Sequence, residues 1–119
     1  MTGRFSVEAT DMDGATVLAL SGELDHDTAE PLREALAAAR SGTGRGRLLV
    51  DCDRLRFCDS TGLNILLQAR LQAEQQGGRV ELVGLRQPVA RMFRITGADE
   101  VFTVHPDLAV ALAQGAGDE

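Results

Sequence analysis

The stretch "FCDSTGLNILL", residues 57–67, joins a strand-like run to a helix-like run through one acid, two hydroxyl groups and a glycine. The run before it, "RLLVDCD" at 47–53, is short and apolar, which predicts a strand. Four leucines at helical spacing predict one face of the helix that follows: Leu63, Leu66, Leu67 and Leu71. Open α/β folds keep their functional sites where a strand ends in this way. Ser60, which stands in the turn, is therefore a candidate functional residue.

The same patterns predict the rest of the chain. Apolar runs predict strands at 16–24, 79–85 and 101–104, and the alternating segment 4–10 predicts a first strand that forms a hairpin with the second. Three more helices are predicted from apolar residues at helical spacing: Ala29, Leu32, Leu36 and Ala39; Val89, Met92 and Phe93; Leu108, Ala111 and Leu112. The order ββαβαβαβα predicts an α/β fold with a central mixed sheet and helices packed on it.

The length of 119 residues suits a single domain, here 1–119 with an ordered core of about 4–114. No stretch approaches the roughly 20 apolar residues that span a bilayer, and the first residues are too polar for a signal peptide. A cytoplasmic protein without membrane contact is therefore expected. Cys52 and Cys58 are predicted to stay reduced, because a lone pair of cysteines in such a protein seldom forms a structural disulfide.

Charge and composition exclude several functions. The net charge is −6, and all 12 basic residues are arginines, so a Schiff-base lysine and a phosphate-loop lysine are both absent. The acidic balance and the four phenylalanines as sole aromatics argue against nucleic-acid binding, which needs clustered positive charge and stacking surfaces. A protein partner or a small ligand remains.

Ser60 has several possible roles. The simplest is helix capping, by Ser60 or by Asp59, for a helix that begins at about Thr61. Gly62 and Leu63 stand where a capping-box partner would be, and neither can reach back, so capping does not explain the whole motif. A serine hydrolase is disfavoured because the glycines of the usual nucleophile turn are missing. The last role is that of a substrate, whose phosphate would meet the positive end of a helix dipole.

Three other kinds of site were weighed and disfavoured. A phosphatase loop built on Cys58 would need an arginine at the position of Asn64. A flavin site would be expected after the first strand, and the chain lacks Trp and Tyr to stack on the ring. A metal bound by "DHD" at 25–27 is disfavoured because consecutive loop residues rarely converge on one ion. The sequence therefore predicts no cofactor, no metal and no catalytic residue.

Three stretches together resemble the STAS domain of bacterial anti-sigma factor antagonists. They are "LSGELDHDTAEPLR" at 20–33, "DSTGL" at 59–63 and the segment from "GGRVELVGL" to "VFTVHPD" at 77–107. The resemblance covers nearly the whole chain. It implies a single STAS domain that is not an enzyme: the unphosphorylated antagonist binds an anti-sigma factor that is itself a serine kinase and so frees the sigma factor. Phosphorylation ends the complex, and a PP2C-type phosphatase resets it.

Carried over by position, the resemblance implies that Ser60 is the phosphorylated residue and that Thr61 is not. Asp25 matches a loop aspartate that helps to dock the kinase, and Asp59, Thr61 and Gly62 complete the contact around Ser60. Ile65, predicted to be exposed one turn further along the helix, is a candidate contact as well. The alternative function is a STAS-type binding module for a transporter or a sensory complex, with Ser60 unused or used differently.

Overall fold

The computed structural model describes residues 4–43 and 46–116. Its five strands form one sheet in the order β1-β2-β3-β4-β5. Their bounds are Phe5–Met12, Ala15–Leu24, Arg47–Cys58, Arg79–Val83 and Val104–His105. β1 pairs with β2 in antiparallel fashion, and every later neighbour is parallel. The N-terminal hairpin and the mixed sheet predicted from the sequence are thereby confirmed.

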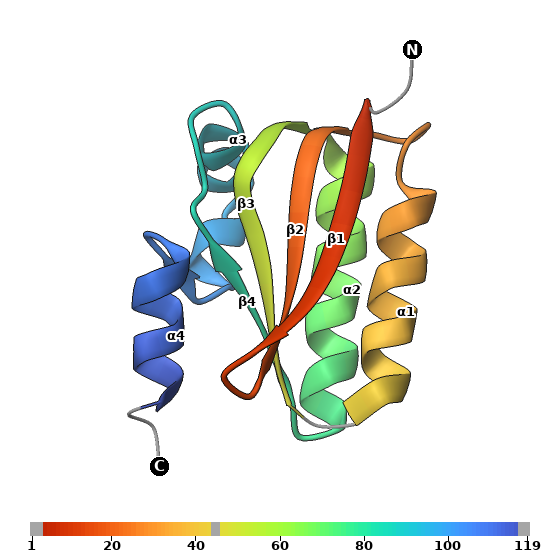
Figure 1. Cartoon of the computed structure of the whole chain (residues 1–119). Coiled ribbons are helices and arrows are strands. Elements are labelled where there is room, and N and C mark those ends of the chain that lie inside the picture. Colours follow the sequence, from red (N-terminus) through yellow and green to blue (C-terminus); the bar gives the residue numbers. More distant parts are fainter. Residues whose placement is uncertain (1–3, 44–45, 117–119) are drawn as a thin grey trace.

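Four α-helices cover the sheet: α1 (Glu30–Thr43), α2 (Ser60–Gln75), α3 (Val89–Thr96) and α4 (Leu108–Ala116). Figure 1 shows α1 and α2 side by side behind β1, β2 and β3, with α3 and α4 on the side of β4. A short 3-10 turn, η1 (Ala98–Glu100), follows α3. Within the described residues, no helix is both long and apolar enough to cross a membrane.

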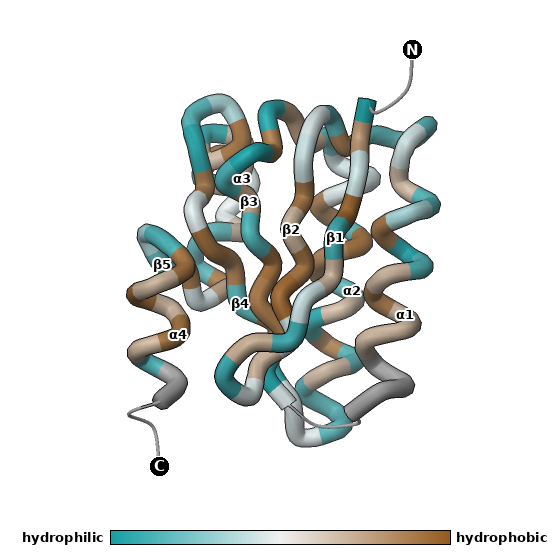
Figure 2. The backbone as a smooth tube through the Cα atoms, in the orientation of Figure 1, coloured by the Kyte–Doolittle hydropathy of each residue, from teal (hydrophilic) through white to brown (hydrophobic). Residues whose placement is uncertain are grey.

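The sheet has a hydrophobic core on each face. The larger core lies between the sheet and the helices α1, α2 and α3, and includes Leu18, Leu66 and Phe93, all fully buried. The smaller core lies under α4, where Ala111 packs with Val17 and Leu49. Figure 2 shows hydrophobic residues concentrated along the central strands. The alternation of these residues along the strands sends one set to each face.

The predicted strand at 101–104 is wrong in its bounds. Residues 98–100 form the turn η1, and β5 comprises only Val104 and His105. Phe102 is buried through packing on Phe93, with ring centroids 6.2 Å apart, and not through strand pairing. An apolar run of this length is compatible with a buried turn as well as with a strand, so the sequence pattern alone did not separate them.

Two further predictions need correction. β3 continues to Cys58, five residues beyond the predicted end at 53, because β2 keeps pairing with it as far as Leu24 and Cys58. Leu71 is 53% exposed, although it was predicted to share a face with Leu63. The second half of α2 packs on the core through Ala69 and Ala73, which follow Leu66 at three- and four-residue spacing.

Candidate functional site

Asp59 caps helix α2. β3 ends at Cys58 and α2 begins at Ser60, so Asp59 is the only residue between them. Its Oδ1 accepts a hydrogen bond from the backbone N–H of Gly62 at 3.1 Å, which satisfies one of the unpaired donors of the first turn. Ser60 is inside the helix, so the interpretation of Ser60 as the cap is wrong. The reason is that the helix begins one residue earlier than its apolar pattern indicated.

Ser60 presents a free hydroxyl group at the start of α2. The residue is exposed, and in the described part of the chain its side chain has no hydrogen-bond partner. Thr61 differs, because it is half-buried and lines a groove between α1 and α2. The partial positive charge of a helix N-terminus favours an anion at this position. Of the two adjacent hydroxyls, the serine is therefore the more accessible to an enzyme.

The loop between β2 and α1 is ordered by Asp25. Its Oδ1 accepts the backbone N–H groups of Asp27 at 2.9 Å and of Thr28 at 3.1 Å. Its Oδ2 accepts from the guanidinium of Arg4 at 2.9 Å. Desolvation raises the pKa of Asp25, but the hydrogen bonds from Thr28 and Asp27 and the charge of Arg4 outweigh it and hold this pKa below its ordinary value. Asp25 is therefore ionised at neutral pH.

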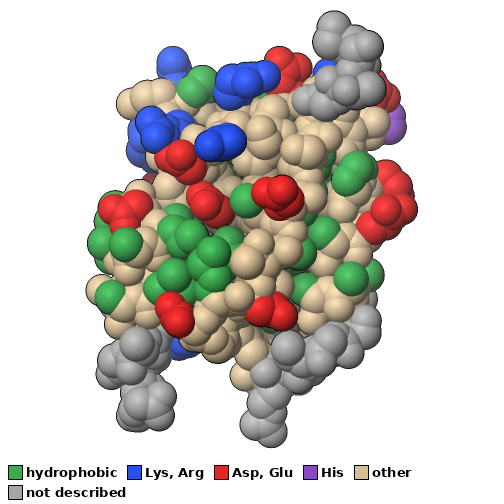
Figure 3. Space-filling view, in the orientation of Figure 1, with side chains coloured by type: hydrophobic (Ala, Val, Ile, Leu, Met, Phe, Trp, Pro, Cys, Tyr) green, Lys and Arg blue, Asp and Glu red, His purple; other side chains and the backbone are tan. Residues whose placement is uncertain are grey.

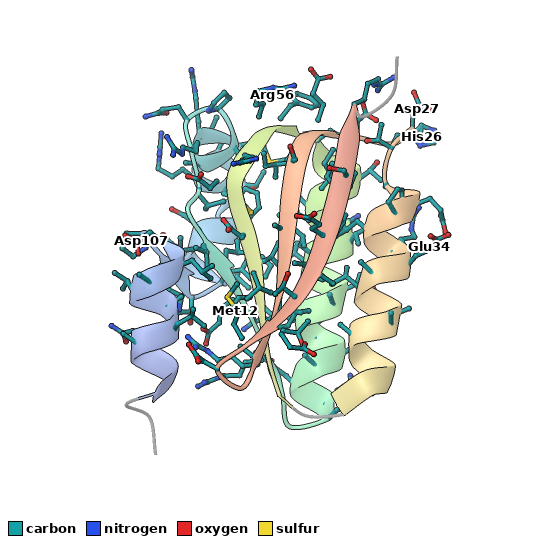
Figure 4. All side chains as sticks on the ribbon, viewed as in Figure 1. Met12, His26, Asp27, Glu34, Arg56 and Asp107 are labelled. Atoms are coloured by element: carbon teal, nitrogen blue, oxygen red, sulfur yellow. The ribbon has the colours of Figure 1, made fainter. Side chains whose placement is uncertain are left out.

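The two loops meet because β2 and β3 are parallel neighbours. Leu24 and Cys58 pair across the strands, so Asp25 and Asp59 come directly after paired residues. The N–H of Asp59 donates to the carbonyl of Leu24 at 3.1 Å, and Asp59 Oδ2 accepts from the N–H of His26 at 3.2 Å. Figure 4 shows His26 and Asp27 at this end of the molecule. The structure thus brings Asp25, Asp59 and Ser60 to one edge of the sheet.

Gly62 is a buried residue in the first turn of α2. A Cβ added at this glycine would lie 2.7 Å from the side chain of Leu24 and 3.0 Å from Cys58 Sγ. The glycine therefore lets the start of α2 approach β2 and β3 closely. A contribution of Gly62 to partner binding has to be indirect, through the position of the helix.

Ile65 is not the isolated exposed side chain that was predicted. It is half-buried, packs against the main core and lines the groove between α1 and α2 together with Thr61 and Asn64. Arg33 and Leu36 of α1 form the opposite wall of this groove. Ile65 is therefore part of a concave surface that begins one residue after Ser60.

Neither cysteine has the properties of a nucleophile. Both are free thiols, as predicted. Burial, and then the charge of Asp59, raises the pKa of Cys58 to about 12. Burial likewise raises the pKa of Cys52. Because the thiolate is the reactive form, both thiols are unreactive at neutral pH.

The acidic loop lacks the geometry of a metal site. In residues 4–43 and 46–116, no three His, Cys, Asp or Glu side chains gather as a possible set of ligands. The oxygens of Asp25 instead face N–H donors and Arg4.

Sequence reasoning missed Arg4 and the link from His26 to Asp59. In the sequence, a glycine at position 22 could have indicated that another strand approaches closely there, and hence where Arg4 lies. This glycine has φ +100°, and a Cβ there would lie 2.0 Å from the carbonyl oxygen of Arg4. Only glycine allows β1 to approach so closely, and this brings Arg4 beside Asp25. The hydrogen bond from the N–H of His26 had no sequence signal.

A five-stranded sheet entered through a hairpin, with a serine and an acid at the carboxyl edge of its central strand, defines a STAS-type domain. The family described as "Mlab, STAS domain" matches residues 8–108, and the chain belongs to this family. The resemblance seen in the sequence is thereby confirmed.

The chain is similar to several anti-sigma factor antagonists. That of anti-sigma F factor in Paenibacillus polymyxa is 27% identical over 101 residues, or 85% of this chain and 86% of the relative. BtrV of Bordetella bronchiseptica, a provisionally assigned anti-sigma factor antagonist, is 33% identical over 93 residues, 78% of this chain and 79% of BtrV. The crystal structure of an antagonist from Mycobacterium paratuberculosis matches with a TM-score of 0.83 at 29% identity, over 92% of each chain.

Proposed function

We propose that this protein is an anti-sigma factor antagonist that is switched by phosphorylation of Ser60. In the unphosphorylated state it binds an anti-sigma factor with serine kinase activity, and the sigma factor is released. The kinase transfers the γ-phosphoryl group of ATP to the Ser60 hydroxyl, with release of ADP and a proton, and the complex dissociates. A PP2C-type phosphatase then hydrolyses the phosphate ester. The names of the relatives and the family membership support the first part of this proposal.

One observation carries the choice of Ser60. Its hydroxyl is exposed and without a hydrogen bond in the described part of the chain, at the first position of α2, whereas the neighbouring Thr61 is half-buried in the groove. A kinase active site has to surround the accepting hydroxyl and align it with the phosphate. The exposed serine meets this requirement without any local unfolding of the helix.

The contact surface consists of the residues around this hydroxyl: Asp25, Asp59, Ser60, Thr61 and Ile65. Gly62 is buried and contributes indirectly, by setting the position of the start of α2. Asp25 and Asp59 supply negative charge on one side, and Thr61 and Ile65 supply a partly apolar groove on the other. A phosphate at Ser60 would be compatible with the fold, because the helix N-terminus stabilises an anion. In the complex it would be desolvated near two carboxylates, which is unfavourable.

The direct experiment is phosphorylation by the purified cognate anti-sigma factor in the presence of ATP. We expect one phosphate per chain, located on Ser60 by fragment mass spectrometry. Ser60→Ala should abolish the modification, and Thr61→Val, the matched control, should retain it. A phosphate located on Thr61, or a Ser60→Ala protein that is still phosphorylated, would contradict the assignment.

A further inference from the structure

A shallow hollow lies on the outer surface of α3. It is lined by Pro88, Arg91, Met92 and Ile95, together with two polar neighbours. Ile95 is 74% exposed, the largest value among the exposed large apolar side chains of the described residues. The buried face of the same helix is formed by Val89 and Phe93, so the exposure of Ile95 does not follow from a poorly packed helix. An exposed apolar hollow on a well-packed helix is a candidate contact site.

Four exposed arginines lie on α3 and on the second half of β3. Arg91 lines the hollow, whereas Arg54 lines a pocket on the sheet that also contains Glu8, Asp51 and Asp53. Arg54 and Arg56 are exposed on β3, and Arg91 and Arg94 are exposed on α3. In the part of the chain that the structure describes, none of the four forms an ion pair with a carboxylate. This holds for Asp99 and Glu100 as well, which lie in the turn after α3. The chain carries a net charge of −6, and these four cations form no ion pair even though Asp51, Asp53 and Glu23 lie on the same part of the sheet.

The two elements that carry these arginines adjoin each other. α3 packs against β3, and Arg86, in the loop that enters α3, donates two hydrogen bonds to Asp53 of β3. Figure 3 shows basic side chains gathered at the end of the molecule where Figure 1 places α3 beside the end of β3. Figure 4 places Arg56 at this same end. We call Arg54, Arg56, Arg91, Arg94 and Ile95 the arginine surface.

We propose that the arginine surface docks an acidic segment of the partner protein, with an apolar side chain of that segment in the hollow beside Ile95. This inference rests on the proposed function, because it extends the contact made around Ser60. Arg56 precedes Ser60 by only four residues, and Phe57, next in the chain, is 46% exposed. A partner that covers Ser60 can therefore reach the arginine surface without a separate binding event.

A protein partner fits this surface better than nucleic acid or a membrane does. Four arginines are few for a phosphate backbone, and the chain has no Tyr or Trp on which bases could stack. Arginine beside an exposed apolar side chain is typical of protein interfaces, where it pairs with carboxylates.

The surface also extends the account of the switch. Complementary charge accelerates association and makes it sensitive to salt. A phosphate on Ser60 adds negative charge at the sheet edge that holds Asp25, four residues after Arg56, so an acidic partner segment would be repelled as it approaches. The arginine surface would then accelerate association with the partner, and a phosphate on Ser60 would slow it.

The test compares two pairs of variants for binding to the purified cognate anti-sigma factor at several salt concentrations. Arg91→Gln/Arg94→Gln removes two charges from the arginine surface, and the control Arg70→Gln/Arg79→Gln removes two charges elsewhere. Ile95→Ser removes the apolar contact, and the control Leu71→Ser removes another exposed apolar side chain on α2. We expect about tenfold weaker binding for Arg91→Gln/Arg94→Gln and for Ile95→Ser, with a smaller salt dependence for the former.

The outcomes separate this inference from the proposed function. If the wild-type protein does not bind the anti-sigma factor, the proposed function fails. If the wild type binds and the arginine-surface variants bind as tightly as their controls, the docking surface is refuted and the proposed function stands. The same proteins are titrated with duplex DNA and with phosphatidylserine vesicles. Binding to either that disappears in Arg91→Gln/Arg94→Gln, with unchanged binding of the anti-sigma factor, would overturn the proposal in favour of that ligand.

Discussion

At the scale of single residues, the sequence pattern made Ser60 a candidate both for helix capping and for modification. In the structure Asp59 is the cap, and Ser60 remains the candidate for modification. Asp59 holds the helix, through its bond to the N–H of Gly62, and also fastens the neighbouring loop through the N–H of His26. Ser60 has neither task and is exposed. A residue free of structural work can be modified without a large cost in folding free energy.

The first prediction concerns the stability of these two positions. Asp59→Ala should lower the free energy of unfolding by about 0.5–2 kcal/mol, because the cap is lost. Ser60→Ala should change it by less than about 0.5 kcal/mol, as is usual for an exposed residue. Denaturant unfolding measures both, and Asp59→Asn, which keeps a capping oxygen, serves as control. A larger loss for Ser60→Ala than for Asp59→Ala would contradict the assignment of the cap.

Gly62 gives the second prediction at this scale. An alanine in a helix normally gains about 1 kcal/mol over glycine. Here the added methyl group would lie 2.7 Å from Leu24, and such overpacking typically costs about 1–3 kcal/mol. We therefore expect Gly62→Ala to destabilise the protein in thermal melts, and the exposed control Asn64→Ala to leave it unchanged or more stable.

A double variant identifies the cause. Leu24→Ala removes the side chain that the new methyl group would meet, so Gly62→Ala should cost less in that background than in the wild type. Equal costs in the two backgrounds would show that contact with Leu24 is not the reason for the glycine.

At the scale of elements, a buried ionic network joins β3, β4 and β5. The Oε1 atom of Glu81 accepts from Arg47 Nη2 at 2.8 Å and lies 2.9 Å from His105 Nε2. Arg79 approaches the other oxygen at 3.4 Å. Glu81 is only 6% exposed. Desolvation raises its pKa, but the hydrogen bonds from His105 and Arg47 outweigh this effect and lower the pKa below its ordinary value.

The third prediction follows from the sign of this shift. A lowered pKa means that ionised Glu81 stabilises the fold above about pH 4.5, its ordinary pKa, and that the contribution is lost as the pH falls through the folded value. Glu81→Gln should cost roughly 3–5 kcal/mol at pH 7, because it leaves the buried Arg47 charge unpaired.

Unfolding experiments at pH 7 and pH 3 test this prediction. The difference between wild type and Glu81→Gln should shrink at pH 3, because Glu81 is protonated in the unfolded chain there while its lowered pKa makes the folded chain resist protonation. The control Glu74→Gln, which removes an exposed ion pair with Arg70, should change stability by about 1 kcal/mol or less. A pH-independent difference for Glu81→Gln would contradict the lowered pKa.

The sequence predicted the order of elements well, because each amphipathic period reports which side of an element is apolar. It did not predict which residues in the later turns of a helix still face the core. Leu71 was placed on the buried face of α2, yet Ala69 and Ala73 pack there instead. Glu81 stands in an apolar run, and only the tertiary structure reveals that Arg47 and His105 meet it.

The candidate site was predictable to a similar degree. The motif around Ser60 located the correct edge of the sheet, since a strand-to-helix turn has a fixed place in a parallel sheet. The groove beside Ile65 and the ion pair between Arg4 and Asp25 depend on distant segments, so no local pattern indicated them.

At the scale of the whole molecule, the exposed hydroxyl, the acidic loop and the arginine surface lie at the carboxyl end of β3. The buried network of Glu81 includes Arg47, the first residue of β3, and so lies toward the opposite end of that strand. The fold is thus stabilised away from the surface that we propose to be switched. A change of charge at Ser60 should therefore alter binding while the structure is retained.

The most direct measurement is titration calorimetry of Ser60→Asp and Ser60→Ala against the cognate anti-sigma factor, with thermal melts of both variants. Both should melt close to the wild type, because neither removes the cap of α2. Ser60→Ala should bind like the wild type. Ser60→Asp should bind about a hundredfold more weakly or worse, because its charge is desolvated near Asp25 and Asp59. Equal affinities of the two variants would show that negative charge at Ser60 does not switch binding, and would contradict the central claim.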